Sequence, residues 1–353
     1  MQKRRWPMFA TLAVVIVVIA GVGLFSWNKF AKTAPESSTP SGSPWGADYF
    51  PNIPLVNQDG ETLYFFDDLI KDKVVMINLI YTTCRDVCPL ETARLKVVKK
   101  ILGDRVGKDI FLYSISIDPK HDTPEVLKAY SERFNTGPGW MFLTGKEEDI
   151  TALRKKLGVF REDETLSKNF ADHDISLIIG NQKTGQWIKS SPFDNPHLLA
   201  EKVGSWLHNW KMPSKDEKNY ADAPQLRDLS RGESLFRTRC AACHTIGDGD
   251  KLQSESGDIG PDLLGVLRRR DRAWLERFIA EPDKMIEEKD PIALSLLAQY
   301  NNIQMPNLQL GEVEISALLK YLEEETARIE PQPPHDHKQP HDHSNEPAAE
   351  GQQ

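Results

Sequence analysis

The chain has 353 residues, enough for two domains and the segments that connect them. Its 52 acidic residues outnumber its 44 basic ones, which gives a net charge of −8, and the sequence has no basic stripe of the kind that a phosphate backbone requires. These features argue against nucleic acid as a partner. The four cysteines are too few for a disulfide scaffold and form two close pairs, Cys84 with Cys88 and Cys240 with Cys243. The pairs predict two separate chemical sites.

The N-terminal segment, residues 1–30, has the pattern of a membrane anchor. Lys3, Arg4 and Arg5 precede an apolar run at 8–25, which is about as long as a helix must be to cross a bilayer. The basic cluster favours a cytoplasmic N-terminus and places the rest of the chain on the periplasmic or extracytoplasmic side. A cleaved signal peptide is the alternative, but neither a small-x-small cleavage signal nor a cysteine for lipidation follows the run. We expect a retained single-pass transmembrane helix.

Residues 45–208 form the first predicted domain, after a tether rich in Ser, Pro, Thr and Ala at 31–44. Apolar runs and helical stretches alternate along it, as in an α/β domain. The expected strands are 74–81, 109–117, 141–145, 175–179 and 186–189, and the expected helices are 89–102, a segment beginning at Thr123, 146–157 and 196–208. This order is typical of a thioredoxin-like domain.

The second half of the chain has a different character. A polar linker with two prolines is expected at 209–224, where no apolar periodicity is found. At 225–328 the apolar positions follow helical spacing, which predicts a small all-α domain. The tail, 329–353, is polar and Pro-rich with two copies of PHDH, and we expect it to be disordered.

The run CAACH, from Cys240 to His244, is the strongest short motif in the chain. A C-x-x-C-H run lets two cysteines on one helical turn form thioethers with the haem vinyl groups, while the histidine binds the iron from one side. A chance match, a zinc site or a redox C-x-x-C pair is the alternative. The motif predicts one covalent haem c held by Cys240, Cys243 and His244. For the second axial ligand, Met305 on a predicted loop is favoured over Met285, which lies among charged residues and is expected in a helix cap or at the surface.

The helical domain resembles the class I cytochromes c at CAACH, at IGPDLLGV (259–266) and at MPNL (305–308). The resemblance implies that His244 and Met305 are the axial pair and that the Pro261 carbonyl orients the His244 ring. Three further residues are expected in the core beside the porphyrin: Trp274, Phe278 and Leu318.

The segment TTCRDVCP, 82–89, follows a predicted strand, at the edge where α/β folds gather their functional groups. If a helix starts at Arg85, Cys84 lies at its positive end, so the pKa of its thiol should be lowered. Cys88 is one helical turn further on, close enough to form a disulfide with Cys84 or to share one metal ion with it. Two thiolates and an imidazole suit copper, and His173, directly before a predicted strand, is the third candidate ligand.

Residues 45–208 resemble the Sco/SenC family in YTTCRDVCP, SISIDPKHDTPEVLKAY and DHDISLIIG, which occur in the family's order. The resemblance implies a copper site of Cys84, Cys88 and His173. It also implies delivery of copper to the dinuclear copper site of cytochrome c oxidase, with the copper-containing oxidase subunit as partner. Asp118 is expected to support the site or to dock the partner. A haem domain is a departure from the usual member of the family.

The remaining histidines are of two kinds. Three are expected at the surface, with the first an outside candidate for the copper site: His121, His197 and His208. Four lie close together in the tail: His335, His337, His341 and His343. Such a tract binds Cu(II) or Zn(II) weakly and reversibly. The hypothesis is that the tail gathers copper and passes it to the cysteine site; a solvated tail without a selected role is the alternative.

Three functions are compatible with the two sites. The favoured one is a copper chaperone coupled to the haem and, through it, to a donor or acceptor cytochrome, because haem iron and the Cu(II)/Cu(I) couple both move one electron. The second is a membrane-anchored thiol-disulfide oxidoreductase that reduces a metalloprotein partner, which requires Cys84 and Cys88 but not His173. The third is a plain electron-transfer cytochrome whose first domain docks a partner.

Overall fold

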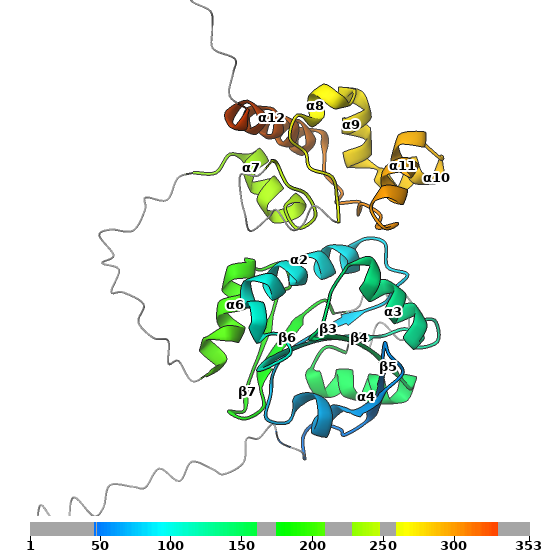
Figure 1. The fold of residues 1–353 in the computed structure, drawn as a ribbon, viewed down its shortest axis with the longest axis vertical. Coiled ribbons are helices and arrows are strands. Elements are labelled where there is room, and N and C mark those ends of the chain that lie inside the picture. Colours follow the sequence, from blue (N-terminus) through cyan, green and yellow to red (C-terminus); the bar gives the residue numbers. More distant parts are fainter. Residues whose placement is uncertain (1–45, 47, 161–173, 209–227, 248–258, 331–353) are drawn as a thin grey trace, which may run out of the picture. The chain divides into compact units, whose positions relative to one another are not determined.

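The computed structural model describes residues 46, 48–160, 174–208, 228–247 and 259–330 (Figure 1). The expected anchor, tether and linker lie outside these residues, as do His173 and the four tail histidines. Within the described ranges, no helix is both long enough and apolar enough to span a bilayer. The described residues form an α/β domain and a helical domain.

One mixed sheet of seven strands organises the α/β domain, in the order β2-β1-β5-β4-β3-β6-β7. The strands are β1 (Pro54–Asn57), β2 (Thr62–Tyr64), β3 (Val74–Ile80), β4 (Ile110–Ser116), β5 (Trp140–Gly145), β6 (Leu177–Asn181) and β7 (Gln186–Ser190). β3, β4 and β5 run parallel, whereas β6 is antiparallel to β3. The five expected strands are confirmed to within two residues. β1 and β2 were not expected, because runs of four and three residues carry too little periodicity.

Helices cover both faces of the sheet. They are α2 (Val87–Leu102), α3 (Pro124–Arg133), α4 (Glu147–Leu157) and α6 (Pro196–Gly204), with short turns η1 (Phe65–Ile70), η2 (Gly103–Arg105) and η4 (Trp206–His208). Figure 1 shows α2, α3 and α6 on one face and α4 on the other. α3 begins at the expected place because the Thr123 side chain accepts a hydrogen bond from the amide of Val126 and Pro124 occupies the first turn.

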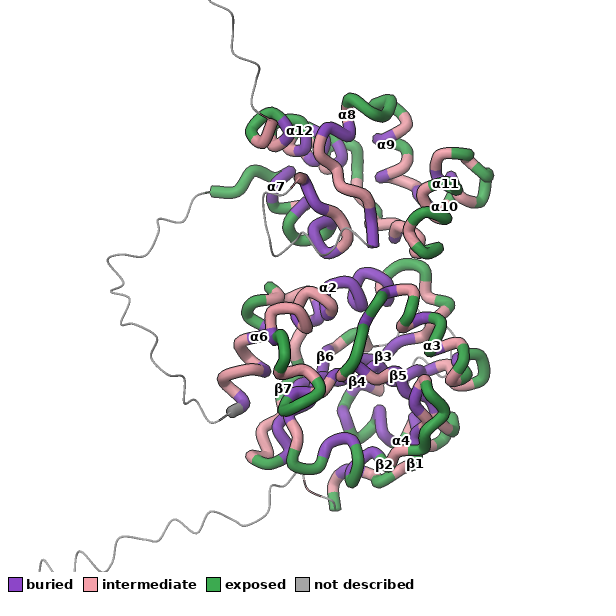
Figure 2. The backbone as a smooth tube through the Cα atoms, viewed as in Figure 1, coloured by how far each residue is buried: buried purple, intermediate pink, exposed green. Residues whose placement is uncertain are grey.

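β3 is buried along its whole length, as the purple tube of Figure 2 shows. Its side chains alternate between the two faces: Met76 and Ile80 pack with α2, α3 and α6, and Val75 and Ile77 pack with α4. Because β3 is packed on both faces, it gives a fixed starting point to the loop that follows it and carries Cys84.

The helical domain has the elements α7 (Arg231–Leu235), η6 (Phe236–Cys240), α8 (Val266–Arg269), α9 (Arg272–Ala280), α10 (Pro282–Glu287), α11 (Pro291–Gln299) and α12 (Glu312–Ile329). The all-α prediction agrees with them, although α8, α10 and α11 were not expected individually. α7 and α12 cross closely at Gly232. A Cβ atom at this position would lie 2.1 Å from the Ala317 carbonyl oxygen. Glycine at this position therefore allows the two helices to meet, and η6 then leads into the CAACH run.

Candidate copper and haem sites

Three chain segments with functional side chains meet at one edge of the sheet. β3 and β4 are parallel, with Ile80 opposite Ser116, so the loops that follow both strands lie at this edge. β6 is antiparallel to β3, with Ile178 opposite Ile77, so β6 begins where β3 ends. The described residues directly before β6, 174–176, therefore lie at the edge where the loop with Cys84 begins.

The two thiols of this edge lie at the start of α2. The helix begins at Val87 rather than at Arg85, so Cys84 precedes its first turn. The backbone amide of Cys88 donates a hydrogen bond to the Cys84 sulfur, with 3.4 Å between the two atoms. Both cysteines are free thiols; Cys88 is fully buried, whereas Cys84 is partly exposed.

The two thiols have opposite acidities. A hydrogen bond from the Cys88 thiol lowers the pKa of Cys84 to about 5 against the effect of burial, and the amides of Cys88 and Asp86 and the hydroxyl of Tyr81 lower it further. The pKa of Cys88 is raised well above its usual value because its thiol donates to Cys84 and is buried. At neutral pH the pair therefore holds one accessible thiolate and one protonated thiol.

Sequence reasoning missed Glu91, on the first turns of α2. Its side chain is 1% exposed, and neither of its carboxyl oxygens lies in good hydrogen-bonding geometry with a donor in the described part of the chain. Burial raises the pKa of Glu91 to about 8, while the nearby Asn78 amide opposes the rise and the Cys84 thiolate adds to it. The segment PLETARL gives no signal for this burial, because a helical glutamate is usually exposed.

Cys84 lies beside apolar side chains of the α/β domain. Cys84, Tyr81 and Phe193 are partly buried against the core that contains Leu90. No group of three potential metal ligands is found among the described residues, which exclude His173.

The other polar side chains considered for the thiol site differ in their contacts. Asp174 accepts a hydrogen bond from the Ser176 amide and lies 3.5 Å from the Lys189 ammonium group. The His121 ring lies 3.3 Å from the Asp122 carboxylate. His197 is exposed, as expected. The Asp118 amide donates a hydrogen bond to the Ser116 hydroxyl, and its carbonyl accepts from the amides of His121 and Asp122.

The second site is a cavity of about 440 Å³ in the helical domain, within the usual range of ligand pockets. Cys240, His244 and Met305 line it, together with the three residues expected beside a porphyrin: Trp274, Phe278 and Leu318. The Nδ1 atom of His244 lies 2.9 Å from the Pro261 carbonyl oxygen, so a proton on Nδ1 leaves Nε2 as the ligating nitrogen. This set of sulfur, imidazole and apolar groups fits a covalent haem c.

Met285 differs from the expectation of a surface residue. It is 1% exposed and is not among the residues that line the cavity of His244 and Met305. The charged neighbours of Met285 concealed a short helix, α10, whose apolar side turns inward. The structure therefore brings Met305, and not Met285, to the cavity of the haem motif.

A second carboxylate missed by sequence reasoning holds the Pro261 segment. Asp262 accepts hydrogen bonds from the Thr245 hydroxyl at 2.5 Å and from the amides of Gly247 and Leu264, each at 2.7 Å. These bonds tie the segment after the CAACH run to the segment that supplies the Pro261 carbonyl. Asp262 thus positions the partner of His244.

Two family models match the chain: SCO1/SenC over residues 46–208 and Cytochrome c over residues 229–325. An SCO2-like protein of Rickettsia typhi is 30% identical over 162 residues, which are 44% of this chain and 74% of that protein. An SCO2-like protein of Rickettsia prowazekii is 36% identical over 139 residues, which are 38% of this chain and 65% of that protein. The match to an SCO2-like protein of Rickettsia felis covers 49% of its length.

Solved structures are similar to each domain. A cytochrome c domain from Pseudomonas putida is 56% identical and covers 28% of this chain and 89% of its own, with a TM-score of 0.25. Yeast Sco1 with copper bound is 23% identical and covers 47% of this chain and 96% of its own, with a TM-score of 0.37. Together, the family models and the relatives show that this chain belongs to the SCO1/SenC family and carries a cytochrome c domain after its thioredoxin-like domain.

Proposed function

We propose that this protein binds one copper ion at Cys84, Cys88 and His173 and delivers it to the dinuclear copper site of cytochrome c oxidase. One observation carries the proposal: a thiolate and a buried thiol lie four residues apart at the sheet edge where β6 begins, and His173 precedes β6 by four residues in the sequence. Family membership supports the same assignment. The copper-containing subunit of the oxidase is the proposed recipient.

The acidities of the two thiols suit reversible copper binding. Cys84 offers a thiolate at neutral pH, whereas Cys88 must release its proton when it becomes a ligand. Sulfur and imidazole ligands favour copper, and a three-ligand set is smaller than structural zinc normally requires. The partly exposed Cys84, beside the apolar side chains of Tyr81 and Phe193, fits contact with a partner surface that receives the ion.

The cytochrome c domain adds a redox function to this proposal. A haem c held by Cys240, Cys243 and His244 supplies a one-electron couple, which matches the single electron of Cu(II)/Cu(I) rather than the two electrons of a disulfide. The Pro261 carbonyl orients the His244 ring, and Met305 is the proposed second axial ligand. We propose that the two domains serve coupled one-electron chemistry, with a further cytochrome as donor or acceptor.

The location of the protein is part of the proposal. Residues 8–25 are proposed to anchor the chain in the cell membrane, with both domains on the periplasmic or extracytoplasmic side. Copper delivery at that side requires no transport of the ion by this chain. The four tail histidines are proposed to collect the ion there.

A second function is favoured by the same acidity difference. A thiolate with a pKa of about 5 beside a protonated thiol is also the arrangement of a nucleophilic and a resolving cysteine. A thiol-disulfide oxidoreductase acting on a metalloprotein partner would use Cys84 to attack and Cys88 to close the disulfide, without His173.

The test is copper titration of the full-length, haem-loaded protein in detergent, with reduced cysteines and a competing chelator that strips weakly held copper from the tail. We expect one tightly bound copper with a sulfur-to-Cu(II) absorption band. His173→Ala and Cys84→Ser should lose the band, and His197→Ala, a change at an exposed histidine, should keep it. Absence of tight copper in the wild type, together with disulfide reductase activity that survives His173→Ala, would establish the second function instead.

A further inference from the structure

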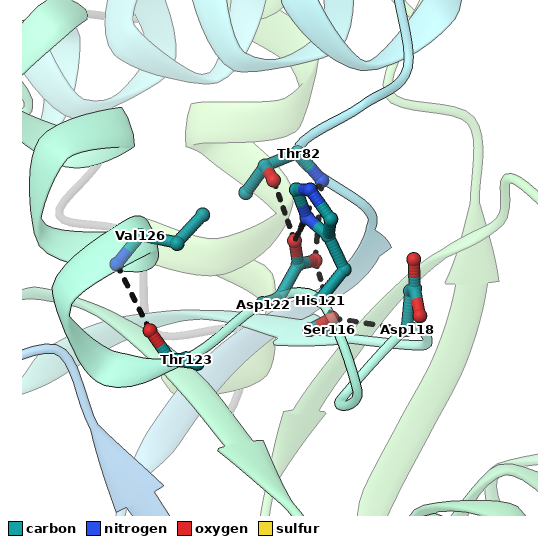
Figure 3. Close-up of polar contacts among 7 residues, drawn as sticks. All are labelled: Thr82, Ser116, Asp118, His121, Asp122, Thr123 and Val126. Carbon is teal, nitrogen blue, oxygen red and sulfur yellow. Dashed lines mark hydrogen bonds and ion pairs between the residues drawn. The ribbon is translucent and has the colours of Figure 1, made fainter.

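A fully buried carboxylate, Asp122, lies in the turn between β4 and α3. Figure 3 shows it surrounded by Thr82, Ser116 and His121. The Asp122 carboxylate accepts hydrogen bonds from the Thr82 hydroxyl at 2.5 Å, from the Ser116 hydroxyl at 2.6 Å and from the Thr82 amide at 3.1 Å. The Nδ1 atom of the His121 ring lies 3.3 Å from the Oδ1 atom of the same carboxylate. Both carboxyl oxygens are therefore engaged.

These hydrogen bonds join the segments that follow β3 and β4, beyond the last paired residues of the two strands. The parallel ladder of β3 and β4 ends at Ile80 and Ser116, and a last bond runs from the Ile117 amide to the Ile80 carbonyl. Thr82 lies beyond that point, two residues before Cys84. The Thr82 amide donates to the Asp122 carboxylate instead of to a neighbouring strand. Asp122 therefore provides hydrogen bonds that the pairing of β3 and β4 no longer provides at the start of the loop that carries Cys84.

The role of Asp122 differs from that of an ordinary helix cap. An aspartate just before a helix usually accepts amides of the first turn. Here the neighbouring Thr123 does so, since its hydroxyl accepts from the Val126 amide at 3.4 Å. Figure 3 shows the Thr123 side chain directed to α3 and the Asp122 carboxylate directed to Thr82. The two residues hold different parts of the structure, so they can be separated by mutation.

We propose that Asp122 is a positioning residue of the thiol site. Through Thr82 and Ser116 it fixes the start of the loop after β3, and thereby the position of the Cys84 sulfur relative to Cys88. In this position the Cys84 sulfur accepts the Cys88 amide, a hydrogen bond that stabilises the reduced pair. Loss of the Asp122 contacts therefore loosens this bond, favours the disulfide and weakens copper binding. The copper part rests on the proposed function, whereas the effect on the dithiol does not.

The first test is the dithiol-disulfide equilibrium of Cys84 and Cys88 in the full-length, haem-loaded and copper-free protein, measured in thiol redox buffers by alkylation and mass spectrometry. Asp122→Asn should shift the equilibrium constant toward the disulfide about tenfold, which corresponds to about 30 mV for a two-electron couple. Thr82→Val, which loses only the hydroxyl donor, should shift it in the same direction by less. Thr123→Ala, the matched control, loses a cap bond in the same turn and should stay within about twofold of wild type.

The second test is copper affinity in the same variants. Asp122→Asn should raise the copper dissociation constant about tenfold and shift the sulfur-to-Cu(II) band, whereas Thr82→Ser, which keeps both donors, should behave as wild type. If Asp122→Asn fails to fold, Thr82→Val and Ser116→Ala carry both tests. Unchanged equilibria in these variants, or an equal shift in Thr123→Ala, would overturn the proposal. If wild type binds no copper tightly, the proposed function fails while the dithiol equilibrium still decides the role of Asp122.

Discussion

The backbone amide of Cys88 donates a hydrogen bond to the Cys84 sulfur over 3.4 Å, while the Cys88 side chain itself is buried. This relationship makes the two cysteines unequal before any metal or partner arrives. The amide and the thiol of one residue both stabilise the thiolate of the other. The inequality has a direct consequence for thiol chemistry.

We predict that Cys84 reacts with an alkylating reagent along a pH profile centred near 5, whereas Cys88 remains protected. In Cys88→Ala the thiol donor is lost, so the midpoint for Cys84 should rise by at least one pH unit. Tyr81→Phe removes a weaker donor and should raise it by less. The measurement is alkylation rate against pH in the haem-loaded protein, followed by peptide mass spectrometry. An unchanged midpoint in Cys88→Ala would show that the thiol hydrogen bond does not set the acidity.

Glu91 should make the α/β domain less stable as the pH rises. Its ordinary pKa of 4.5 increases to about 8 on folding, mainly because of burial. Between these values the folded state binds more protons than the unfolded state, so the free energy of unfolding falls with rising pH, by up to about 1.4 kcal/mol per pH unit. The Cys84 thiolate, whose pKa is lowered from 9.0 to about 5, contributes a slope of opposite sign over the same range. Glu91→Gln should therefore make the slope of the free energy of unfolding against pH more positive than in wild type between pH 5 and pH 8, by up to about 1.4 kcal/mol per pH unit.

The measurement for Glu91 is denaturant unfolding of the α/β domain within the full chain at several pH values. Glu125→Gln is the matched control, because the pKa of this α3 glutamate is lowered by a hydrogen bond to Thr123 and its side chain is exposed. The control should keep the wild-type slope. Equal slopes in wild type and Glu91→Gln would mean that Glu91 stays charged in the folded protein.

The closeness of α7 and α12 gives a third prediction. In Gly232→Ala the new methyl group would meet the Ala317 carbonyl, so the helices must separate at a cost of about 1–3 kcal/mol in the free energy of unfolding. Gly311→Ala is the control, because its nearest contact would be Glu314 at 3.9 Å and its φ of −81° suits alanine. Thermal unfolding followed by the haem absorbance compares the two. A loss of similar size in both variants would contradict the close crossing.

The sequence predicts those parts of the fold that depend on local periodicity and capping. Val74–Ile80 reads as a strand because six of its seven residues are apolar, and α3 is located by the adjacent Thr123 and Pro124. The spacing of Cys84 and Cys88 likewise predicts two thiols on one turn. In these cases the deciding contacts lie within a few positions along the chain.

The missed residues depend on contacts between distant segments. The partner of Asp122, Thr82, is 40 positions away in the sequence, and the motif HDTP by itself indicates only a helix start. The burial of Glu91 follows from the packing of α2 on the sheet, and that of Met285 from the placement of α10. Hydrophobic periodicity predicts neither burial, because in each case one side chain is buried within a segment rich in polar or charged residues.

The axial methionine supplies the last prediction. Met305 lines the cavity of His244, whereas Met285 is buried elsewhere in the helical domain. Met305→Ala should therefore abolish the methionine-to-iron absorption band of the oxidised protein and lower its reduction potential, because a Met/His pair raises the potential of haem iron. Met285→Ala should keep the band and instead lose about 2–5 kcal/mol of the free energy of unfolding, since a buried side chain is truncated. Visible spectroscopy and redox titration of the two variants, with unfolding as the second readout, separate a ligand from a core residue. Retention of the band in Met305→Ala together with its loss in Met285→Ala would reverse the assignment, and the cavity would then have to rearrange when the haem is attached.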